Sequence, residues 1–369
     1  MKKLILMTLL GAFLASCNTP SYQLTGSCME FNDGDTVYIN TMDRVTTKSI
    51  LIDSCVVKNG QFHFQGRQDS AIIVNLITLK NGKLHKLTSK FFLENGDLVA
   101  RGDSIKWSLT GSPHNDIYQK CNDELFPHLL KMWPLFEKVE LESDTTLTEE
   151  QRREYRRIIK EENEAINQIK RRYFEANLDN IIGLEFFYSF INTYDPKKQK
   201  QLTDHFHALY PDDYFVNKHK ERIDKQMKTI VGEKFTDYTM RTPEGKQVSL
   251  SEFVVKNKYT LVDVWASWCT PYSSQKKELE AVYQTYKDKG LEIVGVSLDT
   301  DSAEWVSAIR EWGMPWPQMS DLKGWKSQVT QLYAIESAPH LLLIGQDGTI
   351  IARNIKARTL DEELKRLLE

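Results

Sequence analysis

The sequence predicts a multidomain α+β protein: a small antiparallel β domain over residues 18–111, a helical linker domain over 112–226 and a C-terminal α/β domain over 227–369. Three patterns along the chain favour this class. Short apolar runs separated by Asn-Gly turns come first, and apolar residues at helical spacing follow; the last third alternates between strand-like and helix-like runs. A chain of 369 residues is also too long for one average domain.

Residues 1–17 have the organisation of a secretory signal peptide. Lys2 and Lys3 precede a short apolar run from Leu4 to Leu14, and small residues come directly before Cys17. The apolar run is too short to span a bilayer stably. A plain signal peptide with an accidental cysteine would show the same pattern.

The four residues Leu14-Ala15-Ser16-Cys17 resemble a bacterial lipobox. This resemblance implies cleavage before Cys17, diacylation of that residue and attachment to a membrane through a lipid anchor. Asn18 follows the cysteine where an aspartate would signal retention, which by analogy with known sorting rules favours the outer membrane, facing the periplasm. We therefore expect a protein of the cell envelope.

Charge and cysteine usage narrow the possible partners. The 48 Lys and Arg residues nearly balance the 51 Asp and Glu residues, and basic residues form no patch with interleaved aromatics, so nucleic acid is not an expected partner. After Cys17, four cysteines remain, and the compartment is oxidising. Cys28 and Cys55 lie in neighbouring strand-like segments, where they form either a disulfide or two small buried hydrophobic residues.

Residues from about 22 to 110 have the alternation and the turns of β structure. A strand is expected at Thr36–Ile39, and two hairpins with Asn-Gly turns follow it. The hairpins comprise Ile50–Val57, Asn59-Gly60 and Gln61–Phe64, and then Phe91–Leu93, Asn95-Gly96-Asp97 and Leu98–Ala100. A small antiparallel sandwich or barrel is the expected result.

The segment 112–226 has helical periodicity. Tyr155, Ile159, Ile166 and Tyr173 recur at helical spacing between charged residues, and Thr148 forms a capping box with Gln151 three residues later. His205 and His207 lie two residues apart and would not share a helix face. We therefore expect neither a metal site nor a cofactor in this segment.

From Gly232 onward, strands and helices alternate in the manner of an α/β layer fold with a mixed sheet. Strands are expected at Thr260–Val264, Leu291–Leu298, Leu341–Ile344 and Thr349–Ala352. Helices are expected at Ser274–Lys287 and Ser302–Trp312, and Thr359 with Glu362 caps a last one.

Cys269 stands out as the candidate reactive group. It lies just past a buried strand and at the start of a helix, within the run LVDVWASWCTPY from Leu261 to Tyr272. The unpaired N–H groups and the positive dipole end of a helix stabilise a thiolate, so this position predicts a cysteine pKa below the ordinary value. Pro271 is tolerated in the first helical turn.

This run resembles the active-site strand and turn of thioredoxins, and residues 227–369 resemble the TlpA-like (redoxin) thiol-disulfide oxidoreductases. Asp263 falls at the position of the family's buried proton-transfer carboxylate, and Ala338-Pro339 falls where the family keeps a cis-proline beside the active site. The resemblance implies catalytic roles for Cys269, Asp263 and Pro339. Further residues that fit the TlpA-like pattern are Trp265, Trp268, Trp305, Trp316 and Asp321.

The upstream part resembles an uncharacterised β domain (DUF4369-like) that often precedes TlpA-like domains in envelope lipoproteins. The matching residues are Ile52-Asp53-Ser54, Asn59-Gly60, Phe62–Gly66, Gly111-Ser112-Pro113 and Asn115. This resemblance supports the domain order and implies no activity.

Tyr272 departs from the family pattern. The redox motif of these proteins is Cys-x-x-Cys, and Tyr272 occupies the second cysteine's position. In the two-cysteine mechanism the second thiol resolves the mixed disulfide, which a phenol with a pKa of about 10 cannot do. Cys269 would therefore attack alone and be resolved by an external thiol or by Cys121, and Asp263 either tunes Cys269 or is kept for packing.

His340, directly after Pro339, has two interpretations. It either stabilises the Cys269 thiolate as a Cys–His pair or is a hydrogen-bonded strand histidine. We place it with Trp268 and Ala338 at the expected substrate-binding surface.

Three functions remain open. The first is a monothiol thiol-disulfide oxidoreductase that attacks disulfides of envelope proteins in redox homeostasis. The second is a non-catalytic thioredoxin-fold module that binds extended peptides beside Pro339. The third is a thiol peroxidase, although Val262 and Ala266 occupy positions where a peroxiredoxin motif has proline and threonine.

Overall fold

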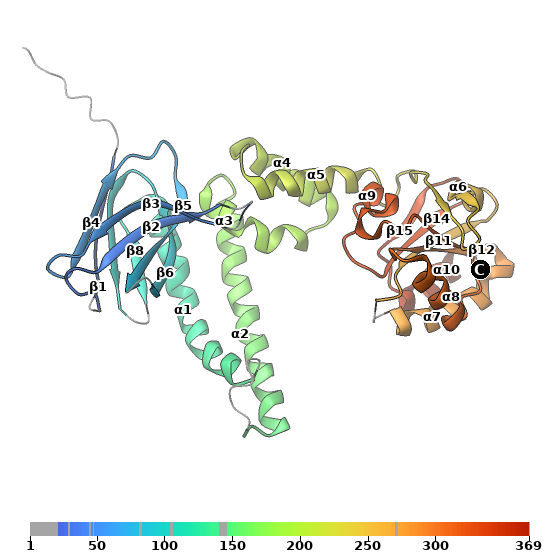
Figure 1. Ribbon diagram of the computed structural model, residues 1–369, viewed down its shortest axis with the longest axis horizontal. Coiled ribbons are helices and arrows are strands. Elements are labelled where there is room, and N and C mark those ends of the chain that lie inside the picture. The colour runs from blue at the N-terminus through green and yellow to red at the C-terminus, as the bar shows by residue number, and fades with distance from the viewer. Residues whose placement is uncertain are drawn as a thin grey trace, which may run out of the picture. The chain divides into compact units, whose positions relative to one another are not determined.

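The computed structural model describes residues 21–28, 30–43, 46, 48–80, 83–103, 106–139, 146–269 and 272–368, without the side chains of 79, 80, 83–89 and 272–274. The chain forms two compact units, Met1–Phe190 and Ile191–Glu369, whose elements are labelled in Figure 1. The predicted signal peptide, with Cys17, lies outside the described residues. The predicted helical segment 112–226 is shared between the two units.

The described part of the first unit begins with two four-stranded sheets. Their strand orders are β4-β1-β7-β8 and β3-β2-β5-β6. All neighbours are antiparallel except β1 and β7, which are parallel. The strands are β1 (Tyr22–Cys28), β2 (Thr36–Met42), β3 (Ser49–Val56), β4 (Gln61–Gly66), β5 (Ile72–Lys80), β6 (Lys83–Leu93), β7 (Gly96–Gly102) and β8 (Trp107–Thr110).

The side chains between the two sheets form one core, so the predicted small β domain is a sandwich. Leu24 and Phe62 from one sheet are buried in the same cluster as Val37 and Val74 from the other. Sheets that each bury one apolar face in this way stabilise one another through the hydrophobic effect.

Both predicted hairpins are wrong, although the turn of the first one forms. Asn59 and Gly60 have the positive φ values that an Asn-Gly turn needs, and Lys58 pairs with Gln61. However, β3 pairs with β2 while β4 pairs with β1. The reason is Val57, which is fully buried between the sheets and donates its N–H to the carbonyl of Asp35, so the chain crosses from one sheet to the other. Likewise β6 pairs with β5, and β7 with β1 and β8.

Three helices complete the first unit: α1 (Pro113–Val139), α2 (Glu149–Ala176) and α3 (Ile181–Phe190). The predicted capping box of α2 is confirmed, because Thr148 and Gln151 each accept the other's backbone N–H. The buried Asn115 fixes the start of α1 against β6: its amide accepts the N–H of Phe92 at 2.9 Å and donates to the carbonyl of Phe92 at 2.7 Å.

The described cysteines of the first unit are thiols. Cys28 is buried and Cys55 is half-buried, which corresponds to the second of the two interpretations of this pair. Cys121 in α1 is fully buried.

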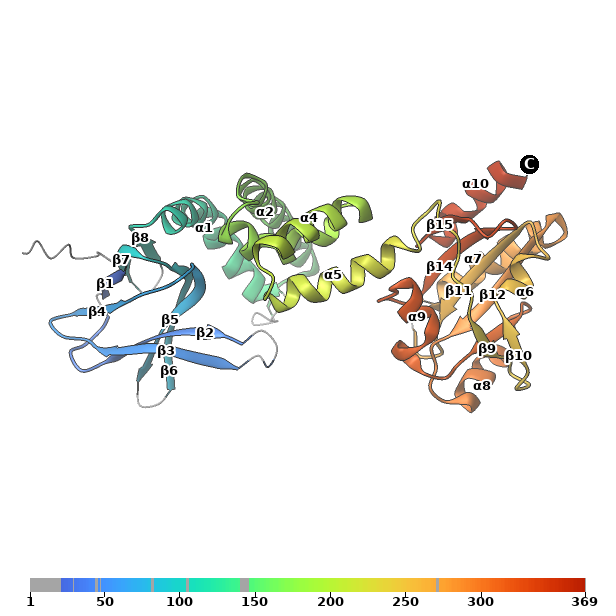
Figure 2. The ribbon, with the colours of Figure 1, turned by 90° about the horizontal axis from the view of Figure 1, so that it is seen from above.

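The second unit opens with the 3-10 helix η1 (Ile191–Thr193) and the helices α4 (Pro196–Leu209) and α5 (Tyr214–Met227), which pack against each other. Asp195 and Asp213 cap the two helices by accepting backbone N–H groups of their first turns. Helix α5 ends beside α9 (Gln328–Tyr333), as Figure 2 shows.

A seven-stranded mixed sheet is the centre of the second unit, in the order β10-β9-β13-β12-β11-β14-β15. Strand β11, in the interior of this sheet, is parallel to β12 and antiparallel to β14, so the predicted mixed sheet is confirmed. The strands are β9 (Thr239–Arg241), β10 (Gln247–Ser249), β11 (Tyr259–Trp265), β12 (Leu291–Ser297), β13 (Gln318–Ser320), β14 (His340–Gly345) and β15 (Ile350–Arg353).

The remaining helical elements are α6 (Ser251–Val254), α7 (Tyr272–Tyr286), η2 (Lys287–Lys289), α8 (Ser302–Trp312), η3 (Gly324–Lys326) and α10 (Ala357–Leu368). The predicted cap of the last helix is wrong. Helix α10 begins at Ala357, and the hydroxyl of Thr359 lies inside its first turn and donates to the carbonyl of Lys356.

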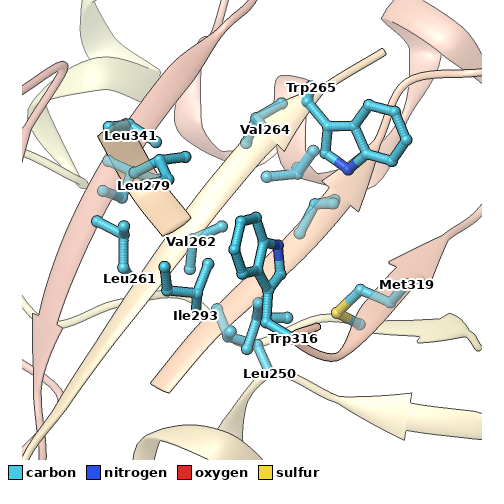
Figure 3. Packing of buried hydrophobic residues seen from close by; sticks show 14 of the residues in the cluster. Leu250, Leu261, Val262, Val264, Trp265, Leu279, Ile293, Trp316, Met319 and Leu341 are labelled. Carbon is cyan, nitrogen blue, oxygen red and sulfur yellow. The ribbon is translucent and has the colours of Figure 1, made fainter. Parts of the chain in front are cut away.

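The core of this unit surrounds β11. All of the strand except Tyr259 is buried, and Figure 3 shows Leu261, Val262, Val264 and Trp265 within the surrounding cluster. A strand buried on both faces is a rigid support for the residues that follow it.

Candidate active site

Cys269 follows β11 through a tight turn in which its N–H donates to the carbonyl of Ala266 at 3.1 Å. Helix α7 begins three residues later, and Thr270 and Pro271 lie outside the described residues. The Cys269 thiol donates to the carbonyl of Ala338 at 3.4 Å, and the residue is only 7% exposed. The protonated thiol is therefore held against the segment before β14.

The sheet brings this segment to Cys269. Strand β14 lies beside β11, with His340 opposite Val264 and Leu341 opposite Asp263. The peptide bond between Ala338 and Pro339 is cis, as the family resemblance implies. Cys269, Ala338 and Pro339, which are about 70 positions apart in the sequence, thus form one wall of the site.

Trp268 lies next to Cys269 and is 53% exposed. Its ring contacts that of Trp325 in η3, at a centroid distance of 6.1 Å, and Trp325 is 43% exposed. Large exposed aromatic pairs are typical of surfaces that bind polypeptide. Sequence reasoning missed Trp325, because only the fold brings η3 to the active-site loop.

Asp299 is a second residue that sequence reasoning missed. It lies two residues after the end of β12, and only 1% of it is exposed. Its carboxylate accepts the backbone N–H of Ser267 at 3.1 Å, the hydroxyl of Ser267 at 2.6 Å and the hydroxyl of Ser297 at 2.7 Å. The carboxyl ends of the parallel strands β11 and β12 lie at the same edge of the sheet. Asp299 therefore lies beside the loop that carries Cys269, and its hydrogen bonds hold that loop in place.

Asp263 lies in the middle of β11 and is fully buried. Its register partners are Gly295 in β12 and Leu341 in β14. The residue is therefore in the sheet interior, six positions before Cys269, and its part in proton transfer remains a prediction.

His340 points to the opposite face of the sheet from Asp263. It pairs with Val264, and neighbouring residues of a strand alternate between faces. Burial, with a further contribution from Arg353, lowers the pKa of His340 to about 3. At neutral pH the ring is therefore uncharged, whereas a Cys–His ion pair needs an imidazolium.

No second cysteine lies near Cys269 in the sequence. Helix α7 begins at Tyr272, whose side chain lies outside the description. Cys121 belongs to the other unit, and burial raises the pKa of its thiol to about 12. A fully buried thiol with so high a pKa is a poor nucleophile at neutral pH.

The described residues contain neither a candidate metal site nor a candidate membrane-spanning helix. Among them, no group of three or more His, Cys, Asp or Glu side chains is arranged to hold a metal ion. Within the same ranges, no helix has the length and apolar character needed to cross a bilayer.

Comparison with known proteins connects both parts of the chain to known families. Residues 231–353 match the AhpC/TSA family, and residues 22–118 match DUF4369, a domain of unknown function. The thiol-disulfide oxidoreductase ResA of Oceanobacillus iheyensis is 30% identical over 133 residues, which cover 36% of this chain and 68% of that protein. ResA of Bacillus thuringiensis is 26% identical over 145 residues, covering 39% of this chain and 80% of that protein.

Among solved structures, a thiol-disulfide oxidoreductase from Bacteroides fragilis is 33% identical to this chain. The match covers 37% of this chain and 100% of that one, with a TM-score of 0.35.

Proposed function

Because this chain belongs to the TlpA-like thiol-disulfide oxidoreductases of the thioredoxin fold, we propose that it attacks protein disulfides through one thiol, that of Cys269. The observation that supports this best is the position of the Cys269 thiol against Ala338 and Pro339, beside the exposed ring of Trp268. The nucleophile and the substrate-facing wall of the family are kept, while Tyr272 replaces the resolving cysteine.

The proposed reaction has two steps. The Cys269 thiolate attacks one sulfur of a substrate disulfide, a new S–S bond forms, and the second substrate sulfur leaves as a thiolate. An external thiolate then attacks the substrate sulfur of the mixed disulfide and forms a new S–S bond with it, while Cys269 leaves as a thiolate and takes up a proton. Trp268, Ala338 and Pro339 hold the substrate chain, Asp263 assists proton transfer, and His340 supports the wall from the opposite face of the sheet.

Trapping the first intermediate tests this function. Full-length protein treated with a twofold excess of an aromatic disulfide such as 5,5′-dithiobis(2-nitrobenzoate) should gain one thionitrobenzoate adduct, located at Cys269 by peptide mass spectrometry. Cys269→Ser should lose this adduct, while the matched variant Cys121→Ser should keep it. Consumption of hydrogen peroxide at a comparable rate would favour a thiol peroxidase, and the absence of any adduct at Cys269 would favour a peptide-binding module.

We also propose that the protein acts in the cell envelope, attached to the outer membrane through lipid on Cys17 and facing the periplasm. The lipobox-like sequence Leu14-Ala15-Ser16-Cys17 supports this location. Its partners there would be envelope proteins that carry thiols or disulfides.

Replacing Cys17 by alanine tests the anchor. The wild-type chain should sediment with membranes, whereas Cys17→Ala should be recovered as a soluble or unprocessed form, because the acyl chains have no attachment point. Fractionation followed by immunoblotting measures this, with Cys28→Ala as the control. Unchanged membrane association of Cys17→Ala would show that the lipobox interpretation is wrong.

A further inference from the structure

The second unit contains a cavity of about 560 Å³ whose lining does not include Cys269. It lies between the start of α4, the end of α5 and the segment that leads into β14. Pro196, Ile230 and Ala334 contribute apolar lining, and Lys197, Arg222 and Arg353 contribute positive charge. The volume lies within the range of about 300–1,000 Å³ that is usual for small-molecule sites.

Arg353 is a half-buried cation in this lining, and its partners are neutral. Its guanidinium donates to the hydroxyl of Thr229 at 3.0 Å, to the carbonyl of Thr229 at 3.3 Å and to the carbonyl of Tyr333. Among the residues that the structure describes, no carboxylate forms an ion pair with it. Burial lowers the pKa of Arg353 to about 10, and Arg222 adds to the lowering. A charge buried without a counter-ion favours the binding of an anion.

Arg222 presents a second guanidinium to the cavity. Its side chain is 19% exposed and donates to the amide oxygens of Asn192 and Gln199 at 2.8 and 2.9 Å. The carboxylate of Glu336 is 3.7 Å away and 67% exposed, so it compensates little of this charge.

The other acid of the lining, Asp195, is committed to the helix cap, because its Oδ1 accepts the N–H groups of Lys197 and Lys198. Three cations therefore face two carboxylates, of which one is used locally and one is largely in solvent.

His340 adds a buried polar group without a partner. It lines the cavity, is 6% exposed, and its Nε2 has no hydrogen-bond partner among the described residues. Buried polar atoms in this condition are rare in native proteins. This nitrogen has almost no accessible surface, so it does not itself contact a ligand in the cavity.

We propose that this cavity binds a small organic acid, with its carboxylate between Arg222 and Arg353 and its apolar body against Ile230 and Ala334. The planar guanidinium fork matches a carboxylate. The small excess of positive charge and the apolar wall favour a singly charged amphiphilic ligand over a phosphate. Among the described lining residues, neither Cys269 nor Trp268 appears, so this site is additional to the proposed redox function and does not depend on it.

Calorimetric titration of the full-length chain tests the site with 2-naphthoate as the probe. The neutral 2-naphthamide has the same ring system and serves as the matched ligand. We expect 2-naphthoate to bind at least tenfold more tightly, Arg222→Gln to abolish most of this preference, and Arg222→Lys to keep part of it. The control Arg310→Gln removes an exposed arginine of α8 and should change nothing.

A cavity-filling variant tests whether the ligand binds inside this cavity. Ile230→Trp keeps every charge and should reduce naphthoate binding at least tenfold. Equal affinity for the acid and the amide, or full binding by Ile230→Trp, would overturn the proposal. The peptide acetyl-Gly-Phe and its C-terminal amide test a different ligand. If the peptide binds more tightly than 2-naphthoate and its amide does not bind, the assignment to a small organic acid is overturned and a polypeptide C-terminus is favoured.

Discussion

Replacing Tyr272 by cysteine is expected to raise multiple-turnover disulfide reduction by roughly 100-fold or more. The wild-type chain has no cysteine in the resolving position, so each mixed disulfide at Cys269 must wait for an external thiol. A thiol three positions after Cys269 makes this attack intramolecular, and effective concentrations in such reactions exceed those of free thiols by several powers of ten.

The measurement is the steady-state reduction of insulin disulfides with dithiothreitol as the donor. Ser273→Cys is the matched control, because it introduces the same thiol one position later in α7 and outside the Cys-x-x-Cys spacing. Wild-type turnover equal to that of Tyr272→Cys would reveal a resolving thiol elsewhere. The double variant Tyr272→Cys, Cys121→Ser should remain as active as Tyr272→Cys, because the Cys121 thiol is buried and its pKa is about 12.

Removing the carboxylate of Asp299 is expected to lower the free energy of local unfolding of β11, β12 and the Cys269 loop by about 3 kcal/mol. Asp299→Ala leaves the N–H and hydroxyl of Ser267 and the hydroxyl of Ser297 without their acceptor, in a place that water scarcely reaches. Asp299→Asn keeps one acceptor oxygen and should cost less.

Hydrogen exchange of the full-length chain, followed by mass spectrometry of peptides from β11 and β12, measures this effect. A loss of about 3 kcal/mol corresponds to exchange that is roughly 100-fold faster in Asp299→Ala. The rate at which Cys269 is alkylated should change as well, because its loop is no longer held by Asp299. The exposed acid Asp288 provides the control, and Asp288→Ala should exchange like the wild type. Unchanged exchange in Asp299→Ala would mean that the loop is held by other contacts.

The sequence was most informative where structure is decided locally. Helix α8 was predicted over Ser302–Trp312, and Asp301 caps its start while Gly313, with positive φ, ends it. The capping box of α2 is local in the same way. The antiparallel partners β14 and β15 were predicted as a hairpin, because a short turn joins them. In the β domain the strand partners were not predicted, because the pairing of β1 with β7 joins segments some 70 residues apart and depends on which faces share a core.

The residues of the candidate site also fall into those that could be predicted from the sequence and those that could not. Cys269, Ala338 and Pro339 were identified together through the family resemblance, and the structure places the Cys269 thiol against the carbonyl of Ala338, which a cis peptide bond joins to Pro339. Asp299 and Trp325 were not identified, because an acid after a strand or a tryptophan in a short helical turn has no distinguishing local pattern. Their proximity to Cys269 results from sheet register and from the path of the loops around it.

The attachment of Arg353 to Thr229 has a consequence for how this domain can be inherited or engineered. The guanidinium of β15 donates to a residue that precedes the stretch 231–353 shared with the AhpC/TSA family, and α4 and α5 belong to the same compact unit. A gene fusion that transferred residues 231–353 alone would carry the Cys269 loop and the cis-proline. It would leave behind Arg222, Thr229 and Ile230, and with them one wall of the cavity. The unit that can be exchanged between proteins without loss of parts therefore begins near Ile191, some 40 residues before the shared sequence.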